Sequence, residues 1–449
     1  MFNTRVLVVL LLSTNILGEV IDEFTTARQE SYDTDSSEKQ VEALNGLGYR
    51  LMTKYVDCNS NNIVMSPLGV TVLLSMALLG STGRTYDELA DILGFSRDIL
   101  KNRNLHENLG SLLQTLSEPS NSKTMFAAAV FVDLHSELRE KYLSYVGRVY
   151  GAGAEHVDFS DGRAATMAIN DWVKVHTHDE IEHFLGEDLP RSTRVVLVNA
   201  VHFKAEWTKP FNPKYTTKMT FQTPEKEVTT DFMLNVGRFR YVLSREDGVH
   251  MVALPYKDNV TTMYALKPWL THNLNITTVL KNLNYAKIDK LINRMEDEDC
   301  VIRFPKMNIE KDFNLEKYIK LEGAPTMFET GNANFALMVE DADNVTNKTV
   351  LDVMSRWGGA DDDINFKQLK DLLDNLPNPG IHVDSIKQKV KINIDEYGTE
   401  AVASTAGIMA RTAELFYADS PFLMFIRNEK TKLVIFSAVI FDPIDKIML

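Results

Sequence analysis

The segment Ile386–Thr405 has the sequence Ile-Lys-Gln-Lys-Val-Lys-Ile-Asn-Ile-Asp-Glu-Tyr-Gly-Thr-Glu-Ala-Val-Ala-Ser-Thr. Its first half predicts a β-strand with one buried face, because apolar residues alternate with polar ones. The strand should end or turn at Glu396 and Gly398. Beyond this point, small side chains stand at every second position: Thr399, Ala401, Ala403 and Thr405. A two-residue period without bulk would let this chain slide between existing strands, because a large inward side chain would overpack the core.

The composition indicates a globular protein with a large core. The chain has 449 residues, of which 44% are hydrophobic and 24% are charged. This length could hold about three domains, although large mixed folds can also be single units. The net charge is −14. A surface with this charge repels nucleic acid and anionic membranes, and we expect neither as a partner.

The N-terminus predicts export from the cell. Residues 1–18 contain one basic residue, Arg5, then an apolar run, and then Gly18 at a plausible cleavage position, which is the pattern of a signal peptide. Its removal leaves 47 basic and 62 acidic residues, a net charge of −15. Residues 19–39 are acidic and polar, and predict a disordered lead-in. No later apolar run is long enough to cross a bilayer, so we expect a secreted, extracellular protein.

The cysteines and the glycosylation motifs are consistent with this location. The chain has only two cysteines, Cys58 and Cys300, which fit an oxidising compartment but form no disulfide framework. The sequence leaves open whether they pair. N-x-Ser/Thr motifs begin at four asparagines, Asn259, Asn275, Asn344 and Asn347. We expect some of these candidate glycosylation sites to be used and others not.

Four other segments carry recognisable patterns: Asn62–Pro67, Leu79–Thr85, Thr193–Trp207 and Phe416–Phe422. In the first, a short strand leads into a helix, because Ser66 is a good N-cap and proline is tolerated at the first helical position. In the third, Thr193–Phe203 is almost continuously apolar. This predicts a central strand that is covered on both faces.

These motifs, with the hinge after Glu396, closely resemble the serpin family from about Gln40 to Pro443. The resemblance implies an α+β fold with a large central mixed β-sheet, further sheets and about nine helices. It implies one serpin domain, residues 40–449, with an exposed reactive-centre loop at residues 396–416. Residues 339–379 do not fit the family pattern. They predict an exposed, glycosylated acidic insertion with its own helix, and we favour a tolerated insertion over a dedicated partner site.

The resemblance also assigns roles to individual residues. The hinge that inserts into the sheet consists of Glu396, Gly398, Thr399, Glu400, Ala401, Ala403 and Thr405. The region where the sheet opens consists of Ser66, Asn199, Trp207 and Gln388. Three departures concern this region, since the family usually has a second serine where Gly69 stands, a glycine where Ala205 stands and a histidine where Gln388 stands. An amide can replace the hydrogen bonds of an imidazole, but without their pH dependence.

The sequence contains no signature of an enzyme. Gly80–Gly83 lacks the spacing of a nucleophile elbow, and no His/Asp pair can be identified beside it. His176, His178 and His183 have no thiolates or carboxylates that would complete a metal site. We therefore expect no catalytic residues, no metal and no cofactor. The segment Ile99–Ser117, basic in some serpins, has few basic residues here, so we expect no heparin-type polyanion as a partner.

The resemblance implies a secreted protease inhibitor that acts as a monomeric suicide substrate and forms a covalent complex with a serine protease. Arg411 is the only basic residue between Gly398 and Phe416, which indicates a trypsin-like target and cleavage at Arg411–Thr412. Counting the usual loop length from Glu396 indicates Thr412 instead, and the bonds Thr412–Ala413 and Met409–Ala410 stay open. The alternative is a non-inhibitory carrier, storage or binding protein with the serpin fold. A bulky or charged inward hinge residue would favour that alternative, and the hinge has none.

Overall fold

The computed structural model describes residues 34–58, 61–117, 122–269, 275–340, 366–397 and 413–444. Nearly all of them belong to one unit, Val41–Leu449, and the first few belong to a separate unit, Met1–Gln40. The first helix, α2 (Thr34–Cys58), begins before the end of the expected lead-in. The acidic Glu38 lies near its start, where negative charge is favourable, and the apolar periodicity alone did not indicate this.

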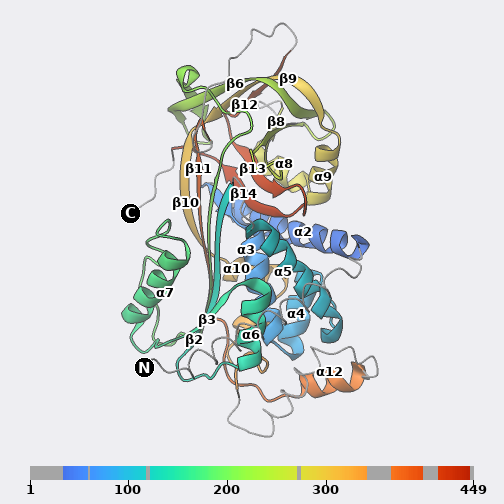
Figure 1. Cartoon of the computed structure of the whole chain (residues 1–449), viewed down its shortest axis with the longest axis vertical. Helices are drawn as coiled ribbons and strands as arrows, with labels where there is room; N and C mark the ends of the chain where they lie inside the picture. The colour runs from blue at the N-terminus through green and yellow to red at the C-terminus, as the bar shows by residue number, and fades with distance from the viewer. Residues whose placement is uncertain are drawn as a thin grey trace, which may run out of the picture. The chain divides into compact units, whose positions relative to one another are not determined.

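The central sheet has five strands in the order β10-β11-β4-β2-β3 (Figure 1). The strands are β10 (Met307–Asn314), β11 (Ser385–Ile394), β4 (Val195–Ala205), β2 (Ser122–Asp133) and β3 (Gly153–Val157). β11 and β4 are parallel neighbours, whereas β4 pairs with β2 and β11 pairs with β10 in antiparallel fashion. The sheet is therefore mixed, as expected.

Both faces of β4 are covered, as its apolar sequence predicted. Val195 and Leu197 belong to the main core beneath α3 (Pro67–Gly80). Val196, Val198 and Ala200 point to the other face and join the apolar cluster of α7 (Gly162–His176). This alternation follows from the two-residue period of a strand. Every residue of α3 is buried, because the helix is apolar on nearly all sides.

A second sheet of nine strands has the order β1-β14-β13-β8-β7-β6-β9-β12, with β5 paired to β6. Its strands are β1 (Ile63–Met65), β5 (Thr217–Gln222), β6 (Glu227–Ser244), β7 (Val249–Pro255), β8 (Thr261–Pro268), β9 (Glu296–Pro305), β12 (Glu414–Tyr417), β13 (Phe422–Asn428) and β14 (Val434–Ile440). β12 pairs with β9 in parallel, and Glu414 lies opposite Cys300. This pairing fixes the chain immediately after the predicted reactive bond.

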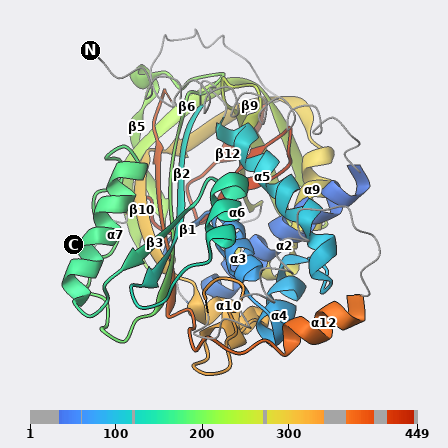
Figure 2. The ribbon, with the colours of Figure 1, turned by 60° about the horizontal axis from the view of Figure 1, so that its bottom comes forward.

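The other helices are α4 (Gly83–Leu93), α5 (Arg103–Ser117), α6 (Glu140–Tyr150), α8 (Ile276–Asn282), α9 (Tyr285–Asn293), α10 (Glu316–Glu322) and α12 (Phe366–Asp374). Short 3₁₀ turns lie at Ile99–Asn102, Pro213–Tyr215 and Thr326–Phe328. Figure 2 shows α3, α4, α5 and α6 grouped together, with α12 beside α4. Within the described ranges, no helix is long and apolar enough to cross a bilayer.

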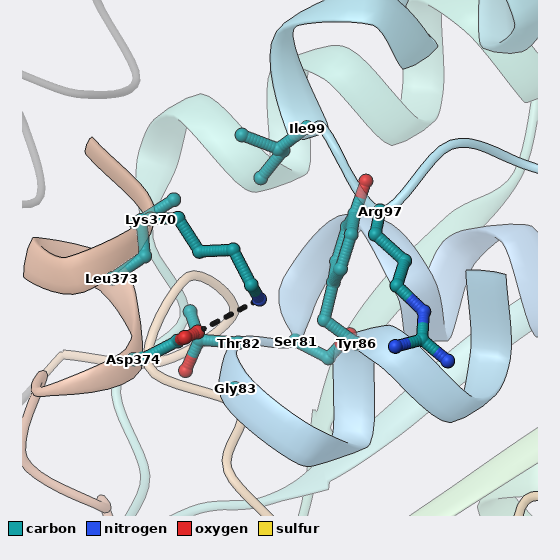
Figure 3. A pocket seen from close by; sticks show the side chains of 9 residues that line it. All are labelled: Ser81, Thr82, Gly83, Tyr86, Arg97, Ile99, Lys370, Leu373 and Asp374. Atoms are coloured by element: carbon teal, nitrogen blue, oxygen red, sulfur yellow. Dashed lines mark hydrogen bonds and ion pairs between the residues drawn. The ribbon is translucent and has the colours of Figure 1, made fainter. Parts of the chain in front are cut away.

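The predicted insertion does contain a helix, α12, but this helix packs against the body. Leu373 and Leu376 are buried, and the Lys370 ammonium lies 3.0 Å from a carboxylate oxygen of Asp87 on α4. Figure 3 shows Lys370 and Asp374, one turn apart on α12, joined by an ion pair beside a pocket that Thr82 and Tyr86 also line. The apolar face of the helix explains the docking. Residues 341–365, with the Asn344 and Asn347 motifs, lie outside the described residues.

Candidate functional site at the seam between two central strands

The boundary between β4 and β11, called the seam below, is the part of the sheet that a returning hinge would have to open. The two strands are paired from Ser385 opposite Val196 to Ile392 opposite Phe203. Both strands point the same way, and the chain leaves β11 at Asp395. A segment that turned back from this end would run antiparallel to both strands, and could bond to both of them if they separated.

A buried hydrogen-bonded cluster crosses the middle of the seam. The Gln388 amide nitrogen on β11 donates to the Asn199 side-chain oxygen on β4 at 2.9 Å, and to the Ser66 carbonyl at 3.0 Å. The Gln388 side-chain oxygen accepts from the Ser66 backbone N–H at 2.9 Å. All three residues are fully buried. We call Ser66, Asn199 and Gln388 the amide lock.

The glycine at position 69 is required by this arrangement. A Cβ atom on Gly69 would lie 1.9 Å from the Asn199 side-chain oxygen and 2.8 Å from the Gln388 amide nitrogen. A serine here, the usual serpin residue, would therefore displace the amide lock. Two of the departures from the family pattern, Gly69 and Gln388, are thus parts of one packing solution.

At the end of the seam nearest the hinge, Trp207 holds the chain that leaves β11. Its indole N–H donates to the Asp395 carbonyl at 3.0 Å, and its backbone N–H donates to the Tyr397 carbonyl at 3.2 Å. The indole ring stacks on Tyr256 with ring centroids 4.4 Å apart. The Phe211 N–H donates to the Glu396 carbonyl at 2.8 Å. The base of the hinge is therefore fixed to the end of β4.

Glu396 adds a charged contact at the same place. Its carboxylate lies 2.7 Å from the Lys306 ammonium and accepts a hydrogen bond from the Thr216 hydroxyl at 2.7 Å. Burial alone raises the pKa of this carboxyl, but the hydrogen bonds from Lys306 and Thr216 outweigh it and hold the pKa below its usual value. We call Glu396, Lys306 and Thr216 the hinge anchor.

Comparison with known proteins identifies the family. The sequence model of the serpins, described as serine protease inhibitors, matches residues 42–443. The chain belongs to the serpin family. This result confirms the family and the α+β fold that the motifs predicted.

This serpin resembles relatives from several animals. It is 27% identical over 421 residues to serine protease inhibitor 28Dc of Drosophila melanogaster, covering 86% of this chain and 76% of that protein. It is 28% identical over 396 residues to human glia-derived nexin, covering 85% of this chain and 88% of the relative. The crystal structure of native protease nexin-1 with heparin superposes with a TM-score of 0.76 at 26% identity, over 91% of this chain and 100% of that one. Members of this family are generally protease inhibitors, and the two relatives just described are not catalytic enzymes in the ordinary sense.

The predicted site residues of this serpin fall into two groups. Most of the hinge (Gly398, Thr399, Glu400, Ala401, Ala403 and Thr405) and the predicted reactive bond Arg411–Thr412 lie outside the described residues. The structure does bring Ser66, Asn199 and Gln388 into contact, and it places Trp207 and Glu396 together at the hinge end of the seam. Their roles in sheet opening stay predictions.

The structure describes the surroundings of Cys300 and of two of the four asparagine motifs. Among the described residues Cys300 is a free, buried thiol, and burial raises its pKa to about 12. Asn259 is exposed between β7 and β8. Asn275 is also exposed, and its side chain caps α8 by accepting from the Thr278 N–H at 2.7 Å. Both are accessible for modification.

Proposed function

We propose that this serpin is a secreted suicide substrate that traps a trypsin-like serine protease after cleavage at Arg411–Thr412. The arginine supplies the specificity, because a trypsin-like protease selects Arg or Lys with a buried aspartate. Arg411 is the only basic residue between Gly398 and Phe416. Selection by charge therefore favours this bond over Thr412–Ala413 and Met409–Ala410.

The proposed reaction begins as ordinary proteolysis. The protease serine attacks the Arg411 carbonyl carbon, the bond to the Thr412 nitrogen breaks, and Thr412 leaves with a new amino group. Arg411 is then an ester of the protease serine. The cut frees one end of the segment that begins at Gly398, while Glu414 stays paired in β12.

The observation that carries the proposal is the closed seam beside a fixed hinge base. β4 and β11 are direct parallel neighbours, so one more strand between them would satisfy both edges. The alternating small hinge residues fit such a position without overpacking. Insertion would draw Arg411 and the attached protease along the seam, and would distort the protease before water can release it.

The energetic balance favours insertion once the chain is cut. A new strand forms two ladders but replaces the single ladder that now joins β4 and β11, so the net gain is about one ladder, roughly 5 kcal/mol at about 1 kcal/mol per hydrogen bond. Opening the amide lock removes three hydrogen bonds, about 3 kcal/mol by the same measure. The uncut protein would thus be held in its closed form kinetically.

The experiment is incubation with a panel of trypsin-like proteases. We expect a covalent adduct that survives a denaturing gel, and a released peptide that begins at Thr412. Thr399→Arg should abolish the adduct, because an inward arginine blocks insertion and turns the inhibitor into a substrate. Ser404→Arg, which places the same side chain on the opposite hinge face, is the matched control and should keep the adduct. Adduct formation by Thr399→Arg at the wild-type level would refute the insertion mechanism.

The proposal includes export and glycosylation. When the full chain is expressed in animal cells, we expect the protein in the medium with Glu19 as its first residue. Enzymatic removal of N-glycans should lower its mass, and Asn259→Gln should remove one glycan if the exposed β7–β8 turn is used. Retention of the uncleaved chain inside the cell would contradict this part of the proposal.

A further inference from the structure

A single residue outside the sheet, Glu180, contacts both strands of the seam. It lies in the connection between α7 and β4. Its carbonyl accepts a hydrogen bond from the Lys391 ammonium on β11 at 2.9 Å, and its carboxylate lies 3.7 Å from the same ammonium. The carboxylate also lies 3.6 Å from His202 Nδ1 on β4. Lys391 and His202 are directly paired across the seam.

His202 is surrounded by charged groups, but its hydrogen-bonding capacity is not fully used. The side chain is buried, and its Nδ1 has no hydrogen-bond partner among the described residues. The charged groups around it are Glu180, Lys391, Lys204 and Glu310. Burial lowers the pKa of His202, Lys391 and Lys204 lower it further, and Glu180 and Glu310 oppose the change.

The geometry of a sheet makes these contacts incompatible with an inserted strand. Adjacent strands lie about 4.8 Å apart, so a new strand would separate β4 from β11 by roughly 10 Å. The carboxylate of Glu180 could not then remain close to both Lys391 and His202. The same connection is also held to β11 where the Lys389 ammonium donates to the His183 carbonyl.

We propose that Glu180 is a positioning residue that clasps β4 to β11, and that its release from one of them limits the rate at which the seam admits a strand. This inference rests on the proposed insertion mechanism. It assigns a control point to the α7–β4 connection, separate from the amide lock and the hinge anchor. Acid should accelerate opening, because His202 becomes more exposed as the strands part and is then more readily protonated than in the closed seam.

The test measures uptake of a synthetic peptide with the sequence of residues 398–411 by the uncut full-length protein. We expect Glu180→Gln to take up the peptide about threefold faster, since the carboxylate contacts are lost but the carbonyl contact to Lys391 remains. Lys391→Met removes the contacts of Lys391 with both the carbonyl and the carboxylate of Glu180, and peptide uptake should be about tenfold faster than in wild type. Glu182→Gln, an exposed residue of the same connection, is the matched control and should behave as wild type.

A pH series distinguishes a clasp from general destabilisation. Wild-type uptake should accelerate as the pH falls from about 7.5 to about 5.5. His202→Gln should remove this acceleration, and Glu180→Gln should enlarge it, because loss of the carboxylate lowers the pKa of His202 further in the closed seam. Wild-type uptake rates in Glu180→Gln and Lys391→Met, or an unchanged pH profile in both Glu180→Gln and His202→Gln, would overturn the inference.

No protease takes part in the peptide test, so the two proposals fail separately. Peptide uptake that follows the predicted order, without any protease adduct, would reject the inhibitory function and keep the clasp. Adduct formation with uptake rates that ignore position 180 would reject the clasp and keep the inhibitory function.

Discussion

The amide lock and the hinge anchor close the same seam with different chemistry. Gln388, Asn199 and Ser66 are neutral and fully buried, so no change of their charge can weaken the middle of the seam. Glu396 and Lys306 form an ion pair near the surface, and the Lys306 side chain is 40% exposed. The comparison predicts that the resistance of the seam to opening does not depend on pH at the amide lock and does depend on pH at the hinge anchor.

The largest expected effect comes from the amide lock. Gln388→Ala should lower the free energy of unfolding by about 3 kcal/mol, because it leaves the buried Ser66 and Asn199 groups without partners. The measurement is the midpoint of urea unfolding, at both neutral and acidic pH. Asn393→Ala, on the exposed side of the same strand, is the control and should change little. A loss that disappears at one pH would contradict the neutral character of the lock.

A second prediction concerns the coupling of Gly69 and Gln388. Gly69→Ser should cost about 1 to 3 kcal/mol, because the new side chain overlaps Asn199. Combining it with Gln388→His, the usual family pair, should recover part of this loss. The measurement is a double-mutant cycle of unfolding free energies. Strict additivity of the two substitutions would show that these positions do not form one packing unit.

The sequence predicted the two strands of the seam, but not most of the residues that contact them from other parts of the chain. The alternation in Ile386–Ile394 and the apolar run in Thr193–Phe203 predicted both strands, because burial of one or two faces has a simple period. The family pattern also indicated Ser66 and Asn199. Lys306, Thr216 and Tyr256 were missed because they come from distant segments, and only the fold brings them to Glu396 and Trp207.

Glu180 is another residue that the sequence did not indicate. It is one of many acidic residues, and no local pattern separates it from its neighbour Glu182. Its partner Lys391 gives no separate signal either, because Lys387 and Lys389 lie on the same polar face of the strand. The docking of α12 was also unforeseen, although its apolar residues predicted the helix itself. Contacts between elements depend on three-dimensional placement, which a one-dimensional period does not encode.

The hinge anchor supplies the third prediction. Glu396→Gln should lower the free energy of unfolding by about 1 kcal/mol at neutral pH, because the Lys306 partner is 40% exposed and water screens the ion pair. The pKa of Glu396 is lowered in the folded protein, so its contribution is present above the unfolded value, near 4.3, and is lost as the pH falls through the folded value. Unfolding midpoints of wild type and variant should therefore converge in acid. A constant difference at every pH would count against the anchor.

The smallest effect is expected for an ion pair away from the seam. Lys370→Met removes the contact between α12 and Asp87, both partly exposed, and should cost less than about 1 kcal/mol. It should leave protease trapping and peptide uptake unchanged. Comparison with Glu396→Gln on the same assays separates loss of an ion pair from loss of the hinge anchor. Slower protease trapping by Lys370→Met would instead connect the inserted segment, residues 339–379, to inhibition.

The most direct test of strand insertion is amide hydrogen exchange of residues 399–405 before and after a cut at Arg411–Thr412. Insertion between β4 and β11 should give these amides the slow exchange of a central strand, because each would be bonded inside a sheet. Exchange that is equally fast before and after the cut would contradict the account.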